Sequence, residues 1–109
     1  MTTNKTINLE DFRTKGSKVF TGRDRGRIVR DASKIDEIEM DEEVNVIIPD
    51  NIYSINPSFF EELFLNVVLK LGREEFLKKF KFQSLGNYDY SKPLHEAIDR
   101  ILRKKTAIG

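Results

Sequence analysis

Short apolar runs separated by polar turns predict several β-strands in this chain. Residues 5–9 alternate polar and apolar side chains, which is typical of a half-buried strand. Residues 44–48 are β-branched and almost continuously apolar, and strands of this kind are usually buried on both faces of a sheet. Residues 81–85 predict another strand, and Val19-Phe20 predicts a brief additional one. The pattern therefore indicates about four strands.

The first predicted helix follows Val19-Phe20. Thr21 with Asp24 three residues later is close to the spacing of a capping box, so we expect the helix to begin at Thr21. Helical spacing then places three side chains on its core-facing side, with Val29 at the margin: Ile28, Ala32 and Ile35.

Two further helical regions follow the strand at 44–48. One helix is predicted from about Pro57 to Leu71, ending at Gly72, with a short helix over 73–79. The last helix is predicted to begin near Ser91 or Lys92. Its apolar side chains recur at helical spacing and predict one buried face: Leu94, Ala97, Ile98, Ile101 and Leu102.

The alternation of strands and helices predicts an α/β fold, with helices packed on a small mixed sheet of about four strands. No repeat or linker interrupts the chain, so we expect one domain over residues 1–109, with its core at about 5–103. The acidic segment 36–43 is interpreted as a solvated connection.

Composition narrows the range of functions. The 109 residues carry a net charge of +1, which argues against a protein that coats DNA or a membrane surface. There is no Cys and one His, so we expect no disulfide, no metal site and no cofactor. No apolar run is as long as a membrane span and no signal-peptide stretch is visible, which predicts a cytoplasmic location.

One stretch resembles a known family. Residues 44–64, VNVIIPDNIYSINPSFFEELF, and the segment FTGRDRGR at 20–27 resemble the STAS-like domain family of unknown function, a bacterial relative of the anti-sigma-factor antagonists. The resemblance extends over about residues 5–103. It implies a STAS-like domain that acts as a non-catalytic regulatory module in bacterial signalling. The implied partner is a protein, either a histidine-kinase-like ATPase or another regulator.

The resemblance places the family's phosphorylated serine at Ser58. The neighbouring positions differ from the family pattern: Asn56 stands in place of Asp, Pro57 in place of a small residue, and Phe59 in place of Gly. A phosphate on Ser58 would meet free N–H groups and the positive end of the helix dipole.

A structural role for Ser58 is the alternative. Ser58 and Glu61 fit an S-x-x-E capping box, and Asn56 before Pro57 is a rival N-cap. Glu61 and Glu62 would oppose an added phosphate.

The helix that Ser58 opens also offers a candidate partner surface. Leu65 and Leu69 are predicted to lie away from the core, where they would contact a partner or a second copy of the chain as a homodimer. The alternative is that the short helix at 73–79 covers them. The candidate interface comprises six residues: Asn56, Pro57, Glu61, Glu62, Leu65 and Leu69.

An arginine stripe gives the second functional hypothesis. Arg23, Arg27 and Arg30 recur at i, i+4 and i+7, and with Gly22 they form a candidate anion-binding or nucleic-acid-binding site. The alternative is a solvated helix face with these side chains mostly exposed, while Arg25 leans toward the fold. His95 lies at the edge of the apolar stripe with no neighbouring nucleophile in the sequence, so we expect a surface position or packing at the fringe of the core. No candidate base or nucleophile stands out elsewhere, so we expect no enzymatic activity.

Overall fold

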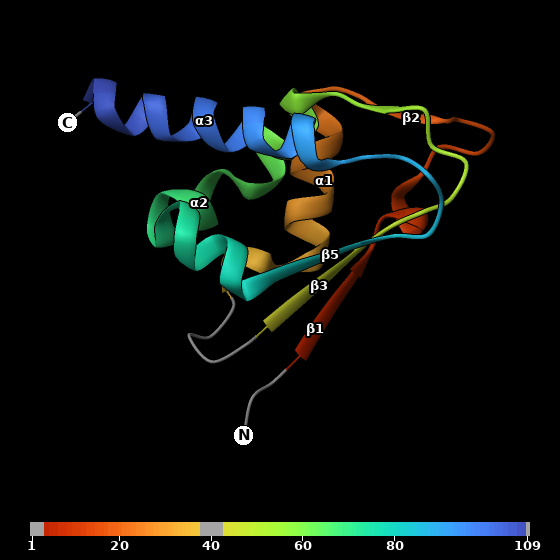
Figure 1. Ribbon diagram of the computed structural model, residues 1–109, viewed down its shortest axis with the longest axis horizontal. Coiled ribbons are helices and arrows are strands. Elements are labelled where there is room, and N and C mark those ends of the chain that lie inside the picture. The colour runs from red at the N-terminus through yellow and green to blue at the C-terminus, as the bar shows by residue number, and fades with distance from the viewer. Residues whose placement is uncertain (1–3, 38–42, 109) are drawn as a thin grey trace.

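In the computed structural model, which describes residues 4–37 and 43–108, two small parallel sheets carry three α-helices (Figure 1). The main sheet has the order β1 (Asn4–Asn8), β3 (Glu43–Ile48), β5 (Phe80–Ser84), and the smaller one pairs β2 (Val19–Phe20) with β4 (Ser54–Ile55). The predicted α/β fold is confirmed. The four-stranded mixed sheet is wrong, because every strand pair in the described residues is parallel and the strands divide between two sheets.

Helices provide the crossovers that parallel strands require. The connection from β1 to β3 contains α1 (Arg23–Ser33), and the connection from β3 to β5 contains α2 (Pro57–Lys79). α3 (Ser91–Ile108) follows β5, and two 3-10 helices cover Leu9–Phe12 and Ile35–Glu37. Because both crossovers step across the sheet in the same direction, α1 and α2 lie on the same side of it (Figure 1).

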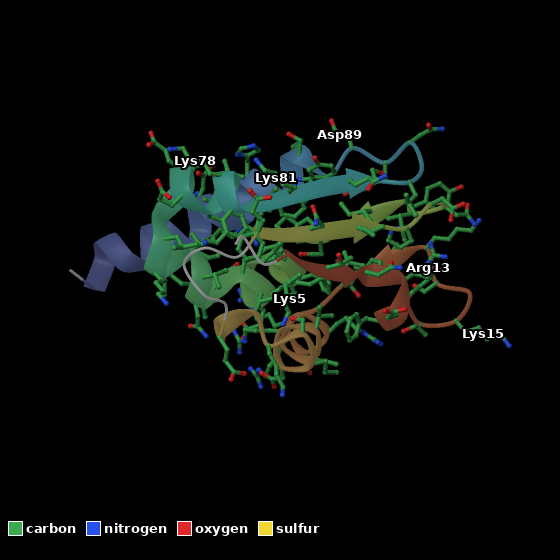
Figure 2. All side chains as sticks on the ribbon, turned by 90° about the horizontal axis from the view of Figure 1, so that it is seen from below. Lys5, Arg13, Lys15, Lys78, Lys81 and Asp89 are labelled. Carbon is green, nitrogen blue, oxygen red and sulfur yellow. The ribbon has the colours of Figure 1, made fainter. Side chains whose placement is uncertain are left out.

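The other face of the main sheet is open. Along β3, Val44, Val46 and Ile48 are buried, whereas Glu43 and Asn45 are exposed. Asn45 is in register with Lys81 on β5, which is also exposed and is labelled in Figure 2. The prediction that this strand is buried on both faces is therefore wrong, since within the described residues the helices cover one face of the sheet and leave the other exposed.

The core is centred on phenylalanine side chains. The ring centroid of Phe64 lies 5.1 Å from that of Phe76, 5.5 Å from Phe80 and 5.8 Å from Phe82. Phe76 reaches this cluster because α2 breaks at Gly72, whose φ of 80° is easily adopted only by glycine. The predicted helix end at Gly72, followed by a short helix, is confirmed.

The start and the buried face of α1 differ from the prediction. Gly22 is the N-cap, with φ of 87° and no capping side chain, so the Thr21 capping box is wrong. Ile28 is 54% exposed and Val29 is fully buried. α3 begins at Ser91 as expected. The acidic connection was predicted over 36–43, and its residues 38–42 lie outside the described part of the chain.

Candidate functional site

The smaller sheet brings the starts of α1 and α2 together. β2 leads into α1 and β4 leads into α2, and the two strands pair in parallel. The pairing is extended by two backbone hydrogen bonds, from Tyr53 N to Lys18 O at 2.7 Å and from Asn56 N to Phe20 O at 2.8 Å. The two N-terminal turns are therefore neighbours in space, which brings Arg23 of the anion-binding hypothesis close to the turn that contains Ser58.

Glu61 is the centre of the resulting charged site. Its side chain is 1% exposed, and cations from two other helices converge on its carboxylate. Arg23 of α1 lies 3.2 Å away, Arg100 of α3 lies 3.7 Å away, and the Lys104 ammonium of α3 donates a hydrogen bond to the same group. Glu61 thus ties all three helices together.

Burial and two of these cations, Lys104 and Arg23, set the pKa of Glu61. Burial by itself raises the pKa of this carboxyl group, because a charged group loses solvation in the interior. Hydrogen bonds from Lys104 and Arg23, together with their positive charges, outweigh burial and hold the pKa below its ordinary value. Glu61 is therefore ionised at neutral pH. A capping box with Ser58 is wrong for this residue, since its carboxylate pairs with cations of α1 and α3.

Glu62 forms ion pairs with the other two arginines of the stripe. Its carboxylate lies 3.6 Å from Arg27 and 3.5 Å from Arg30, and Arg30 also donates to the Glu62 carbonyl at 2.8 Å. Arg30 also lies 3.9 Å from the carboxylate of Asp36, which is the third acidic residue of this group after Glu61 and Glu62. The expectation that the whole stripe is mostly exposed is wrong for Arg30, whose side chain is only 13% exposed. We name these residues the Glu61 cluster: Glu61, Glu62, Asp36, Arg23, Arg27, Arg30, Arg100 and Lys104.

A shallow hollow of about 500 Å³ lies at the start of α1, lined by Thr21, Gly22, Arg23, Asp24, Arg25 and Ile28. Arg25 does lean toward the fold, as predicted. It donates to the Phe12 carbonyl at 3.1 Å and to the Thr14 hydroxyl at 2.7 Å. The guanidinium of Arg23 pairs with the Glu61 carboxylate, so it is not directed at the candidate anion-binding position next to Gly22.

The first turn of α2 is capped by Asn56. Its side-chain oxygen accepts a hydrogen bond from Ser58 N at 2.8 Å, and its carbonyl accepts one from Phe59 N at 2.9 Å. Pro57 has no N–H group. These N–H groups are already bonded, which corrects the expectation that a phosphate on Ser58 would meet them free. In the described residues the Ser58 hydroxyl makes no hydrogen bond, and the residue is half-buried.

The predicted partner surface on α2 is only partly available. Leu65 and Leu69 are half-buried and pack against the hydrophobic core, so the prediction that they lie away from it is wrong. Glu61 is buried as well. Asn56 remains exposed and Pro57 half-buried at the start of the helix.

A larger hollow, of about 870 Å³, was missed by the sequence analysis. It lies at the carboxyl ends of the strands and includes Arg13, Asp50, Tyr53, Tyr88 and Asp89 in its lining. Figure 2 shows Arg13 and Asp89 at the end of the main sheet toward which the arrowheads point. The sequence did contain a signal for it, because residues 50–53 come two positions after the predicted strand at 44–48 and residues 86–89 follow the one at 81–85.

Polar side chains that line this hollow form hydrogen bonds with the protein's own backbone. The Arg13 guanidinium donates to the Asp50 carbonyl, and the Tyr88 hydroxyl accepts from Ile55 N at 3.0 Å. Open α/β sheets usually form a ligand crevice where the strand order reverses, and the described strands of the main sheet, in the order β1-β3-β5, contain no such reversal.

His95 lies at the surface as predicted, with its Nδ1 3.3 Å from the Arg73 guanidinium. In the described parts of the chain, no group of three or more His, Asp or Glu side chains is arranged to hold a metal ion. None of the described helices is long and apolar enough to cross a membrane.

The fold and the Glu61 cluster define a small α/β protein with helices on one face of a parallel sheet. No protein-family model, curated protein or solved structure matches the chain.

Proposed function

We propose that this chain is a non-catalytic protein-interaction module of STAS-like type, in a bacterial signalling system, and that the start of α2 is its regulated contact. The observation that supports the proposal is the environment of Ser58. Asn56, and not Ser58, caps α2, so the Ser58 hydroxyl has no structural bond to lose. The side chain is half-buried in the first helical turn, directly after β4.

The charges next to Ser58 give a phosphate there a distinct effect. Residues three and four positions apart on a helix are neighbours, so Ser58 shares one face of α2 with Glu61 and Glu62. A phosphate adds about −1.5 to −2 charges at pH 7. It would repel these carboxylates and compete with them for Arg23, which lies 3.2 Å from Glu61 and 3.8 Å from Glu62.

Phosphorylation would therefore act at the junction of the helices as well as on any partner. A partner that contacts a neutral hydroxyl would face a desolvated charge after modification, which disfavours binding. The phosphate donor implied by the resemblance is a histidine-kinase-like ATPase.

The proposal is tested with the purified chain as bait in cell extracts of its source. We expect one retained partner to bind the parent and Ser58→Ala alike and to be lost with Ser58→Asp. The matched control is Ser91→Asp, which places the same charge at the exposed start of α3. Retention of the same partner by Ser58→Asp at the parental level contradicts the switch, and loss with both Asp variants indicates a general charge effect.

A further inference from the structure

The Glu61 cluster presents cations on the surface of the three-helix junction. Four side chains in it are about half exposed: Arg23 at 48%, Arg27 at 57%, Arg100 at 42% and Lys104 at 49%. They come from α1 and α3, and the carboxylates that hold them come from α2. We call these four side chains the junction surface.

Positive charge exceeds negative charge in the cluster. Five cations share three carboxylates, which leaves a surplus of two positive charges where the whole chain has a net charge of only +1. A guanidinium has five N–H donors and an ammonium three, against roughly four acceptor sites for each carboxylate. The internal ion pairs therefore leave N–H donors of the junction surface facing solvent.

The buried carboxylate also reduces the cost of binding at this surface. Long cationic side chains normally lose rotamer freedom when they bind, which weakens affinity. Here Glu61 is fixed on α2 and already holds Arg23, Arg100 and Lys104 near one another. A single buried carboxylate needs fewer than three cations for neutrality, so the remaining charge is available to an external acid.

We propose that the junction surface binds an acidic segment of a partner protein, that is, a short run of Asp and Glu side chains. This rests on the proposed protein-binding function but not on the role of Ser58. Charge complementarity identifies the occupant, because guanidinium groups match carboxylates in geometry as well as in charge.

A nucleic acid fits the same surface less well. Strong binding to the DNA backbone, with about 6–10 phosphate contacts, needs far more positive charge than a surplus of two. Binding of single strands also uses aromatic side chains for base stacking, and none of the residues of the Glu61 cluster is aromatic.

The test measures binding of a fluorescent oligo-glutamate peptide at low and moderate salt, with oligo-glutamine as the uncharged reference. The test variant is Arg27→Gln with Arg100→Gln, which leaves Glu61 paired with Arg23 and Lys104. The lysine control is Lys78→Gln with Lys81→Gln, which also removes two positive charges, at exposed residues outside the Glu61 cluster. Lys78 is 72% exposed near the other end of α2 and pairs with Glu75, and Lys81 is exposed on β5. Thermal midpoints verify that all three proteins are folded.

We expect the double variant to bind oligo-glutamate about fivefold more weakly, since each exposed charge pair contributes modestly. The lysine control should bind like the parent. Equal losses in both variants, or no oligo-glutamate binding by the parent, overturn the proposal.

A single-stranded oligonucleotide of equal charge completes the experiment. If it binds the parent more tightly than oligo-glutamate and loses affinity in the double variant, the surface is one for nucleic acid and the acidic-segment proposal is wrong. Failure here leaves the Ser58→Asp result unaffected, because that experiment is read on the retained partner. The two proposals therefore fail separately.

Discussion

Gly26 on α1 lies so close to α2 that a Cβ atom on it would sit 2.4 Å from the carbonyl oxygen of Phe59. The same Cβ atom would lie 3.2 Å from Leu63 N, so it would be too close to two backbone atoms of α2. Only glycine permits this approach of the two helices. This approach in turn sets the distance between Arg23, which lies one turn before Gly26 on α1, and Glu61, which lies between Phe59 and Leu63 on α2.

Gly26→Ala should therefore destabilise the protein. In an ordinary helix interior, Gly→Ala stabilises by roughly 0.5–1 kcal/mol. At Gly26 the added methyl group must push α1 from α2, and we expect the free energy of unfolding to fall by about 1–3 kcal/mol. Urea denaturation measures the change. Asp31→Ala, at an exposed position of the same helix, is the control and should shift stability by no more than about 0.5 kcal/mol. A raised urea midpoint for Gly26→Ala would contradict the close packing.

Two adjacent residues of α1 give a second prediction. Val29 is fully buried, whereas Ile28 is 54% exposed. Val29→Ala removes two buried carbons and should cost roughly 2 kcal/mol, including the cavity left behind. Ile28→Ala removes more carbon but from the surface, and should cost no more than about 0.5 kcal/mol. Urea midpoints of the two variants show which residue of α1 faces the core. A larger loss of stability for Ile28→Ala than for Val29→Ala would support the face predicted from hydrophobic spacing.

The error at Ile28 has a physical reason. Hydrophobic spacing counts large apolar side chains and gives no weight to Gly26, although the close contact at Gly26 is what orients α1. Elements with a clear pattern of apolar side chains were predicted well. The β-branched run became β3, and the apolar stripe of α3 is buried at Leu94, Ala97, Ile98 and Ile101.

The candidate site was less predictable than the fold, and Glu61 shows why. A charged residue in a helix is normally assigned to solvent. Glu61 is buried because cations from residues 23, 100 and 104 meet it in space, and no local pattern relates these positions. The sequence identified the arginine stripe, but pairing with Glu61 and Glu62 depends on how α1 crosses α2.

The depressed pKa of Glu61 predicts a pH dependence of stability. A carboxyl group whose pKa is lower in the folded than in the unfolded state stabilises the fold above its unfolded pKa, about 4.3 for Glu. That contribution is lost as pH falls through the lower folded value. Glu61→Gln should unfold about 1–3 kcal/mol more easily at pH 7, as expected for lost hydrogen bonds to a charged group.

The measurement compares urea midpoints of the parent and Glu61→Gln from neutral to acidic pH. The difference between them should remain constant above about pH 5 and narrow below about pH 4. A difference that stays constant across the whole range would show that Glu61 keeps an ordinary pKa in the folded protein.

The last prediction separates capping from regulation at the start of α2. Asn56 accepts a hydrogen bond from Ser58 N at 2.8 Å, whereas the Ser58 hydroxyl makes no hydrogen bond in the described residues. Asn56→Ala should therefore cost about 0.5–2 kcal/mol of stability, and Asn56→Asp should retain most of it because Asp caps as well as Asn. Ser58→Ala should change stability by no more than about 0.5 kcal/mol. Thermal and urea midpoints of the three variants provide the comparison. If Ser58→Ala costs as much as Asn56→Ala, the Ser58 hydroxyl caps the helix in solution, and a hydroxyl already used in this way is not free to serve as the regulated contact.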